Sequence, residues 1–237
     1  MTCFITGDTH GTHDIWKLNE FSKGRGAELT KADYLIIAGD FGLLWYPEGS
    51  EEDKEDAGWL EWLNDQPWTT LFVDGNHENF PRLNSYRVNE WHGGKIHMID
   101  DSIYHLMRGQ VFDIDEKKFL TMGGGASHDK QWRTEGLSWW AEEVPSQEER
   151  NEALMNLDMN DWKVDYVVTH DAPVSIAKLL IRGKWDRTTD EYEEWLQTEI
   201  ADKLDFKRWF FGHHHTDWGF GDDGKYRALY YDIIEID

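Results

Sequence analysis

The stretch that decides the fold is TCFITGDTH, residues 2–10, in which an apolar run stops at a glycine and is followed by polar residues. Apolar runs of this length, rich in β-branched and aromatic residues and ended by Gly or polar residues, are typical of buried strands. Four later stretches have the same form: DYLIIAGD (33–40), TTLFVDGNHE (69–78), DYVVTHDAP (165–173) and RWFFGHHH (208–215). The sequence therefore predicts several buried strands, each ending at polar side chains.

Helical patterns lie between these strands. They are IWKLNEF (15–21), EEDKEDAGWLEWLND (51–65), a segment after Pro145, and TTDEYEEWLQTEIADKL (188–204). Strands that alternate with helices indicate an α/β fold with much parallel sheet. With 237 residues and no linker rich in Pro or Ser, we expect one domain over residues 1–237.

Three other stretches carry local signals. VFDIDEKKFLTM (111–122) predicts a β-hairpin that turns around Glu116 and Lys117, and RALYYDIIEID (227–237) predicts a late strand. The acidic run EGSEEDKED (48–56) is interpreted as a solvated loop or a first helical turn. Residues at about 123–160, which begin GGGASHDKQWR, predict an inserted loop and helix.

The charge balance limits the possible partners. The chain has 24 Lys and Arg against 47 Asp and Glu, a formal net charge of −23. A field of that sign repels polyanions, so we expect no non-specific binding to nucleic acid and no membrane partner. A small phosphorylated substrate held by a metal remains compatible with it. The N-terminus lacks the pattern of a signal peptide and no apolar run reaches about 18 residues, so we expect a cytoplasmic protein.

Potential metal ligands follow each strand of the predicted sheet. In open α/β sheets, ligands bind beyond the carboxyl ends of the strands. The residues at these ends are Asp8, His10, Asp40, Asn76, His77, His170 and the triplet His213–His215. Oxygen and imidazole donors suit Mn, Fe, Zn or Co, and the chain has one cysteine, which disfavours a thiolate site. There are enough donors for two metals, and Asp40 is our candidate for the bridge because a carboxylate can serve both ions.

The ordered motifs resemble a known family. Gly7–His10 (GDTH), Gly39–Asp40 (GD), Gly75–Glu78 (GNHE), Thr169–His170 (TH) and Gly212–His215 (GHHH) resemble the calcineurin-like metallophosphoesterases, whose pattern is D-x-H, G-D-x-x-D, G-N-H-[DE], H and G-H-x-H. The resemblance spans the chain almost end to end. It implies a β-sandwich flanked by helices in αββα layers.

The resemblance also implies a role for each matched residue. Asp8, His10 and His215 would bind one metal, Asp40 would bridge, and Asn76, His170 and His213 would complete the second site. His77 would act on the leaving-group oxygen or stabilise charge on the phosphoryl group. The catalytic set is thus His77, Asp40 and Asn76, with two divalent ions, Mn favoured, and a metal-activated hydroxide as nucleophile.

One position departs from the family pattern. Family members usually carry a second acid in G-D-x-x-D, which orients the histidine of G-N-H, but this chain has Leu43 there. Because a ring nitrogen is usually fixed by the partner of the other nitrogen, the orientation of His77 must come from another group. A backbone carbonyl is one group that could replace the missing carboxylate.

The inserted region is the candidate for substrate recognition, since loops on a rigid scaffold commonly carry specificity. Arg133, Lys130 and His128 are the proposed substrate contacts, with arginine suited to bidentate phosphate binding. Trp139 and Trp140 either stack on a base or anchor the loop to the core, and burial is the commoner fate of tryptophan. RGKWDR (182–187) is a second basic group of residues that we expect near the site.

These features predict a dinuclear metal-dependent phosphoesterase that cleaves P–O bonds of phosphomonoesters or phosphodiesters, including nucleotides. One alternative is a single-strand nuclease of the same family, and another is a metal-binding scaffold without turnover. Within the triplet, alternation along an extended chain would turn His213 and His215 to one side and His214 to the other. We therefore expect His214 to be dispensable for metal binding.

Overall fold

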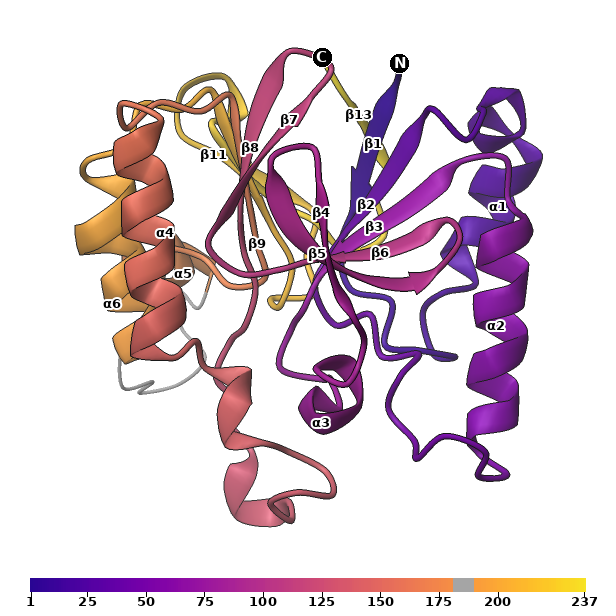
Figure 1. Cartoon of the computed structure of the whole chain (residues 1–237). Coiled ribbons are helices and arrows are strands. Elements are labelled where there is room, and N and C mark those ends of the chain that lie inside the picture. The colour runs from indigo at the N-terminus through magenta and orange to yellow at the C-terminus, as the bar shows by residue number, and fades with distance from the viewer. Residues whose placement is uncertain (181–189) are drawn as a thin grey trace.

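The computed structural model describes residues 1–180 and 190–237, and within them the strands form two sheets that pack face to face (Figure 1). The first sheet has the order β13-β1-β2-β3-β6-β5-β4, and the second has the order β11-β12-β10-β9-β8-β7. The strands of the first sheet are β1 (Cys3–Thr6), β2 (Tyr34–Ala38), β3 (Thr69–Val73), β4 (Val88–Trp91), β5 (Gly94–Asp100), β6 (Ile103–Leu106) and β13 (Ile234–Ile236). Those of the second are β7 (Gln110–Ile114), β8 (Lys117–Met122), β9 (Tyr166–Thr169), β10 (Arg208–Phe211), β11 (Trp218–Phe220) and β12 (Tyr226–Ala228).

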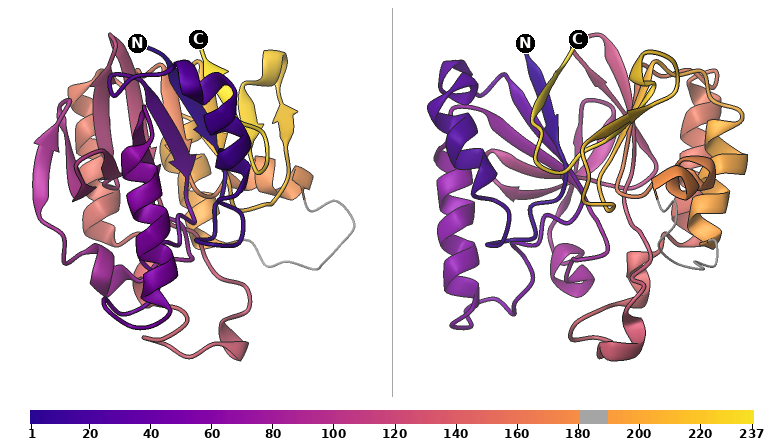
Figure 2. Two further views of the ribbon diagram at one scale, coloured as in Figure 1. Left: turned by 90° about the vertical axis from the view of Figure 1, so that its right-hand side faces the viewer. Right: turned by 180° about the vertical axis from the view of Figure 1, so that it is seen from behind.

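Helices cover the two outer faces, as both views of Figure 2 show. On the first sheet lie α1 (Lys17–Lys23) and α2 (Asp53–Asp65), and on the second lie α4 (Gln147–Met159), α5 (Val174–Leu180) and α6 (Glu191–Trp195). A π-helical segment, Leu196–Ala201, continues α6, and the short α3 (Phe80–Leu83) follows β3. The 3₁₀ turns are Arg25–Glu28, Lys130–Trp132, Ala141–Glu143 and Asp222–Gly224.

The core is divided by the alternation of side chains along the buried strands. In β2, Ile36 packs between the two sheets, together with Phe119 and Phe210 of the second sheet. Its neighbours Leu35 and Ile37 point to the other face, into a cluster with α1 and α2. Strands covered on both faces need apolar residues at every position, which explains the continuous runs of the sequence.

A third apolar cluster lies between the second sheet and its helices. Leu157 of α4, Ile176 of α5 and Tyr192 of α6 are buried there against Leu120 and Val167. The three clusters separate four layers, helix–sheet–sheet–helix. The predicted αββα sandwich is therefore confirmed, with parallel ladders at the centre of each sheet and antiparallel strands at the edges.

The structure corrects several local predictions. The hairpin turns at Asp115 and Glu116, both with positive φ, one residue earlier than predicted. The late strand is two strands, because β12 joins the second sheet and β13 the first. Strands β4, β5 and β6 were not predicted from the sequence, although His92 and Gly93, at positive φ between β4 and β5, provide a turn signal there.

Other segments differ in their burial or boundaries. The acidic run is only partly solvated, because Asp53 pairs with Arg82 and Asp56 is buried in the first turn of α2. The helix predicted from residue 188 begins at Glu191, with Asp190 capping it. The basic segment 182–187 lies outside the described residues.

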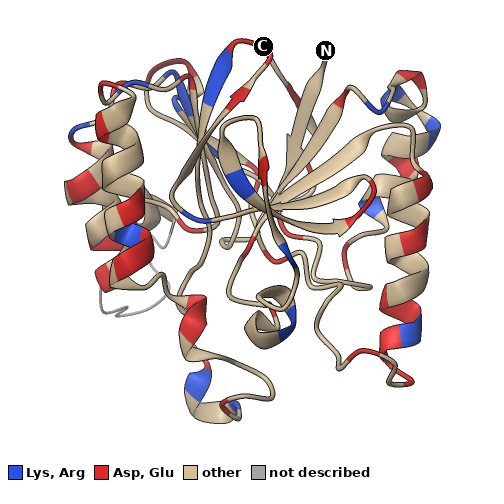
Figure 3. Ribbon diagram, viewed as in Figure 1, with Lys and Arg blue, Asp and Glu red and all other residues tan. Residues whose placement is uncertain are grey.

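Acidic side chains lie along the outer helices α2, α4 and α6 (Figure 3). The outer helices thus carry part of the acidic excess that gives the chain its net charge of −23. None of the helices in residues 1–180 and 190–237 is long and apolar enough to cross a membrane.

Candidate metal centre

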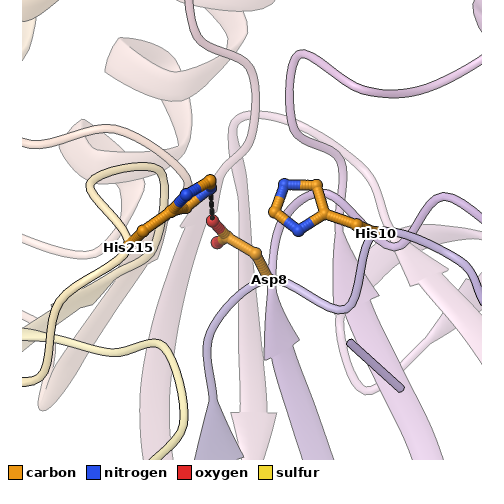
Figure 4. A group of neighbouring side chains, drawn as sticks. All are labelled: Asp8, His10 and His215. Carbon is orange, nitrogen blue, oxygen red and sulfur yellow. Dashed lines mark ion pairs between the residues drawn. The ribbon is translucent and has the colours of Figure 1, made fainter. Parts of the chain in front are cut away.

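The first ligand group consists of Asp8 and His10, which follow β1, and His215, the last residue of the histidine triplet. Asp8 Oδ2 lies 3.2 Å from His215 Nε2, and the ring of His10 packs edge-on against that of His215, with 4.8 Å between ring centroids. Figure 4 shows Asp8 and His10, from the loop after β1, beside His215 of the triplet. Their donor atoms lie within 4.8 Å of one another, which is close enough to hold a single metal ion.

Asp40, after β2, lies between two sets of donors. Its Oδ2 is 3.1 Å from His10 Nε2, and its Oδ1 is 3.3 Å from His170 Nε2. The backbone N–H of His77 also donates to Oδ1, at 2.7 Å. The side chain is 1% exposed, so both oxygens face the interior of the centre.

The second ligand group follows β3, β9 and β10. His170 Nε2 lies 3.1 Å from Asn76 Oδ1 and 3.2 Å from His213 Nδ1. The other nitrogen of His170, Nδ1, lies 3.0 Å from the carbonyl of Ala38 and donates to it, so Nε2 is the nitrogen that would bind a metal once it has lost its proton. Nε2 faces the oxygens of Asn76 and Asp40, and a cation would satisfy these converging acceptors.

Two further observations show that the residues fit a metal. Asp8 Oδ2 is buried, and apart from its ion pair with His215 it has no hydrogen-bond partner among the described residues, as expected of a ligand atom. Glycines bring backbone against both central carboxylates: a Cβ on Gly75 would lie 2.0 Å from Asp40 Oδ1, and one on Gly212 would lie 2.0 Å from Asp8 Oδ1. Only glycine can occupy either position.

The carboxylates concentrate positive charge on two imidazoles. Burial alone would lower the pKa of His10, but Asp40, Asp8 and Asp14 raise it to about 9. His170 is fully buried, yet Asp40 and Asp8 raise its pKa to about 10. Because metal ligands must be neutral imidazoles, a divalent cation would supply the positive charge that the protons supply here.

Outer residues hold these ligands in place. Asp14 Oδ2 lies 2.8 Å from His10 Nδ1 and so orients the ring, as carboxylates commonly do for ligating histidines. The buried ammonium of Lys17 donates to the carbonyls of Gly7 and Asp8, at 2.9 and 2.8 Å. Neither residue was predicted from the sequence, although the spacing of four residues between His10 and Asp14 is a signal for the latter.

The inserted region contributes a second set of supports. Asn76 Nδ2 donates to Ser127 Oγ at 3.0 Å, which leaves Asn76 Oδ1 directed at the centre. Ser127 in turn donates from both its N–H and its hydroxyl to the buried carboxylate of Glu143, at 2.8 Å each. Lys130 lies 2.6 Å from Glu143 Oε1, so its charge already has a partner, and its contact with substrate stays a prediction.

Comparison with known proteins shows the family of the chain. The family model for calcineurin-like phosphoesterases matches residues 1–217. The chain belongs to this family. Its members are metal-dependent phosphoric ester hydrolases.

Similar individual proteins are more distant. A lariat debranching enzyme of Schizosaccharomyces pombe is 26% identical over 211 residues, which is 80% of this chain and 44% of the relative's length. The chain thus spans less than half of that relative. Among solved structures, sulfate thiohydrolase SoxB of Thermus thermophilus has a TM-score of 0.46 at 12% identity, covering 97% of this chain and 51% of SoxB. The phosphopantetheinyl hydrolase PptH of Mycobacterium tuberculosis has a TM-score of 0.43 at 16% identity, covering 97% of this chain and 88% of PptH.

The departure from the family pattern at Leu43 has a structural reason. Leu43 is fully buried in the apolar cluster beneath α1 and α2. The expected backbone carbonyl is not found beside His77 among the described residues. Instead, the terminal nitrogens of Arg133 lie 3.4 Å from His77 Nδ1 and 3.3 Å from Nε2, and the ring of Trp45 lies 6.0 Å away between centroids.

The neighbours of His77 affect its charge as well as its orientation. Burial and the positive charge of Arg133 lower the pKa of His77, although Asp40 opposes them. A carboxylate at position 43 would instead raise the pKa of His77. Glu78, the last residue of GNHE, instead fixes the loop after Asp40, because its carboxylate accepts from the N–H groups of Phe41 and Gly42 at 2.7 and 3.2 Å.

The histidine triplet does not have the predicted extended backbone. His213 and His215 have φ of 62° and 46°, in the left-handed region. His214 contacts the buried Asp171, with 3.0 Å between Nε2 and Oδ1, and its dispensability for metal binding stays a prediction. His128 is exposed, with its ring centroid 5.8 Å from that of His213, at the rim of the second ligand group.

Proposed function

We propose that the chain is a dinuclear metal-dependent phosphoesterase that hydrolyses P–O bonds of phosphomonoesters or phosphodiesters. The supporting observation is that the two oxygens of Asp40 face different ligand sets. Oδ2 faces His10 of the first group, and Oδ1 faces His170 of the second. A bridging carboxylate of this kind lets two cations act on one phosphate.

The donor set favours particular metals. Carboxylate, amide and imidazole donors without thiolate suit Mn, Fe, Zn or Co, and we propose Mn. When bound, the metals supply an activated hydroxide and neutralise charge on phosphoryl oxygens. Asp8, His10 and His215 would hold one ion, Asn76, His170 and His213 the other, and Asp40 both.

The chain's own side chains complete the site around the phosphate. His77 lies 5.5 Å from His10 between ring centroids, so it reaches the same space and can donate a hydrogen bond to the leaving-group oxygen. Arg133 brings a permanent charge beside it, suited to a phosphoryl oxygen. Both Arg133 and Ser127 come from residues 123–160, which supports our proposal that this region is an insertion serving the active site within one domain.

A single-strand nuclease of the same family is the second candidate function. It is favoured by the similarity to a lariat debranching enzyme and opposed by the net charge of −23, which repels a polynucleotide. A metal-binding scaffold without turnover is the third candidate. It has less support, because His77 and Arg133 lie together beside the candidate centre, where both can contact a substrate.

The test is hydrolysis of aryl phosphate esters by metal-loaded protein. Wild-type protein loaded with Mn²⁺ should hydrolyse an aryl monoester or diester, and Asp40→Asn should abolish this activity. Asp113→Asn, at an exposed strand position, is the matched control and should retain it. A panel of aryl monoester, aryl diester, cyclic nucleotides and single-stranded oligonucleotide separates the enzyme candidates. Absence of hydrolysis with all of Mn, Fe, Zn and Co would favour the scaffold.

A further inference from the structure

The histidines of the two ligand groups differ in what holds their rings. The second nitrogen of His10 is bound by Asp14, and that of His170 by the carbonyl of Ala38. His215 has no such hydrogen bond at Nδ1 among the described residues, although a ligating ring is usually held through its second nitrogen. Its side chain is 51% exposed, and its φ of 46° lies outside regular helix or strand. Another kind of contact must therefore hold this ring.

The ring of Tyr230, which lies between β12 and β13, provides this contact. It is stacked on the ring of His215, with 4.7 Å between centroids and 13° between the two planes. This spacing is favourable for aromatic pairs, and a stacked neighbour restrains the rotation of the imidazole. The contact leaves the edge of the imidazole open, so Nε2 stays directed at Asp8 Oδ2, from which it is 3.2 Å.

The hydroxyl of the same tyrosine reaches the support of the other histidine in the first ligand group. It donates to Asp14 Oδ2 at 3.2 Å, since a carboxylate only accepts. The same oxygen lies 2.8 Å from His10 Nδ1. Tyr230 thus contacts His215 directly and His10 through Asp14, and both histidines belong to the group that would hold the first ion.

The backbone of Tyr230 is itself fixed on both sides. Its N–H donates to Asp217 Oδ1 at 2.8 Å, and its carbonyl accepts from the buried ammonium of Lys17. Lys17 also donates to the carbonyl of Asp8 at 2.8 Å, so it ties the segment that carries Tyr230 to the segment that carries a ligand. The tyrosine ring is therefore presented from a fixed place beside the first ligand group.

We propose that Tyr230 positions both histidine ligands of the first metal ion, His215 by stacking and His10 through a shared carboxylate. The proposal rests on the proposed function, because it takes the dinuclear centre as given. Among the described residues, Tyr230 makes no hydrogen bond or ring contact with His170 or His213 of the second ligand group. Replacing Tyr230 should therefore weaken the binding of the first ion and leave the binding of the second unchanged.

The test is calorimetric titration of the metal-free, full-length protein with Mn²⁺ in two backgrounds. His213→Ala lacks a ligand of the second ion and keeps the first group complete, whereas His215→Ala does the reverse. In the His213→Ala background, Tyr230→Leu should weaken Mn²⁺ binding roughly 10- to 100-fold, the usual loss for a residue that orients a ligand. Tyr230→Phe keeps the stacked ring and loses the hydroxyl, so its affinity should lie between the two. In the His215→Ala background, Tyr230→Leu should leave the affinity unchanged.

Tyr104→Leu is the matched control, because this partly buried tyrosine packs against Trp91 of the edge strand β4, with 5.7 Å between ring centroids, and it should bind both ions as wild type does. Unchanged affinity of Tyr230→Leu in the His213→Ala background would overturn the proposal and leave the dinuclear centre intact. Equal weakening in both backgrounds would overturn it in favour of a general structural role.

Tyr230→Phe decides the matter if the leucine variant does not fold. Unchanged affinity for the first ion in Tyr230→Phe would then overturn the link to His10 through Asp14. Binding of a single Mn²⁺ by the wild-type chain would overturn the proposed function, and this inference with it.

Discussion

Arg133 approaches His77 with both terminal nitrogens, 3.4 Å from Nδ1 and 3.3 Å from Nε2. Guanidinium N–H groups only donate, and a neutral imidazole has one acceptor nitrogen, so at most one of the two contacts is a hydrogen bond. The other donors of Arg133 are turned to Asp129 and to the carbonyl of Ser138. The contact therefore brings a fixed positive charge to the histidine that is expected to act on the substrate.

Replacing this charge should lower activity without removing the metals. Arg133→Gln should reduce kcat/KM for an aryl phosphate ester by roughly 10- to 100-fold, the loss expected for one charge-assisted contact to a phosphoryl oxygen. The kcat/KM of Arg133→Lys should lie between those of wild type and Arg133→Gln, since lysine keeps the positive charge but not the paired N–H donors of the guanidinium. Arg87→Gln, at an exposed arginine, is the control. A full loss of bound metal in Arg133→Gln would instead indicate a structural role.

Ser127 and Glu143 should affect metal affinity through Asn76. Ser127→Ala removes the acceptor for the Asn76 amide and should weaken metal binding by roughly 10-fold or more, in line with other residues that orient ligands. Glu143→Gln should have the same direction of effect, because it disturbs the orientation of Ser127. Metal titration followed by calorimetry measures this. Unchanged affinity in both variants would show that Asn76 is oriented independently of the inserted region.

His214 and His213 should separate into different phenotypes. His213→Ala should lose metal affinity. His214→Ala should retain it but reduce the free energy of unfolding by about 1–3 kcal/mol, because it removes one hydrogen-bond partner of the buried Asp171. Thermal unfolding and metal content measured on the same preparations test both parts. Equal loss of metal in the two variants would contradict the division of the triplet.

Asp56 should destabilise the ligand-free protein as the pH rises. Burial, with a contribution from Asp53, raises the pKa of its carboxyl from 3.8 to about 7. The folded state therefore binds more protons than the unfolded state between these values, so stability is lost as the pH rises through this window. Asp56→Asn should raise Tm by roughly 2–12 °C at pH 8 and by less at pH 5. This range follows from a gain of about 1–3 kcal/mol, with about 2–4 °C in Tm for each kcal/mol. A Tm difference that is the same at both pH values would contradict this ionisation.

The sequence was sufficient for the fold and the central donors because both depend on local pattern. Asp8 and Asp40 each follow a buried strand after one glycine, so the parallel ladder of β1 and β2 brings them together. His170 follows β9 of the second sheet and reaches them because the two sheets pack face to face. The strands β4 and β5 escaped prediction, since their partly exposed residues lack continuous apolar runs. The mostly buried β6 has only four residues, with a histidine among them.

The surroundings of the donors could not be predicted in the same way. Ser127, Glu143 and Arg133 reach the centre from an irregular loop whose path depends on tertiary packing, so no spacing in the sequence links them to Asn76 or His77. Residue composition likewise cannot predict which acid of a strongly acidic helix end is buried, as Asp56 is. These unpredicted contacts are the ones that we expect to determine the substrate.

The number of metal ions per chain tests the central claim most directly. After loading with Mn²⁺ and removal of free ion, elemental analysis should find two ions per wild-type chain, because the two oxygens of Asp40 serve two ligand sets. Asp40→Asn should lower the occupancy of both sites together, whereas Asp113→Asn should leave two. One ion per wild-type chain, or two ions retained by Asp40→Asn, would contradict a dinuclear centre bridged by Asp40.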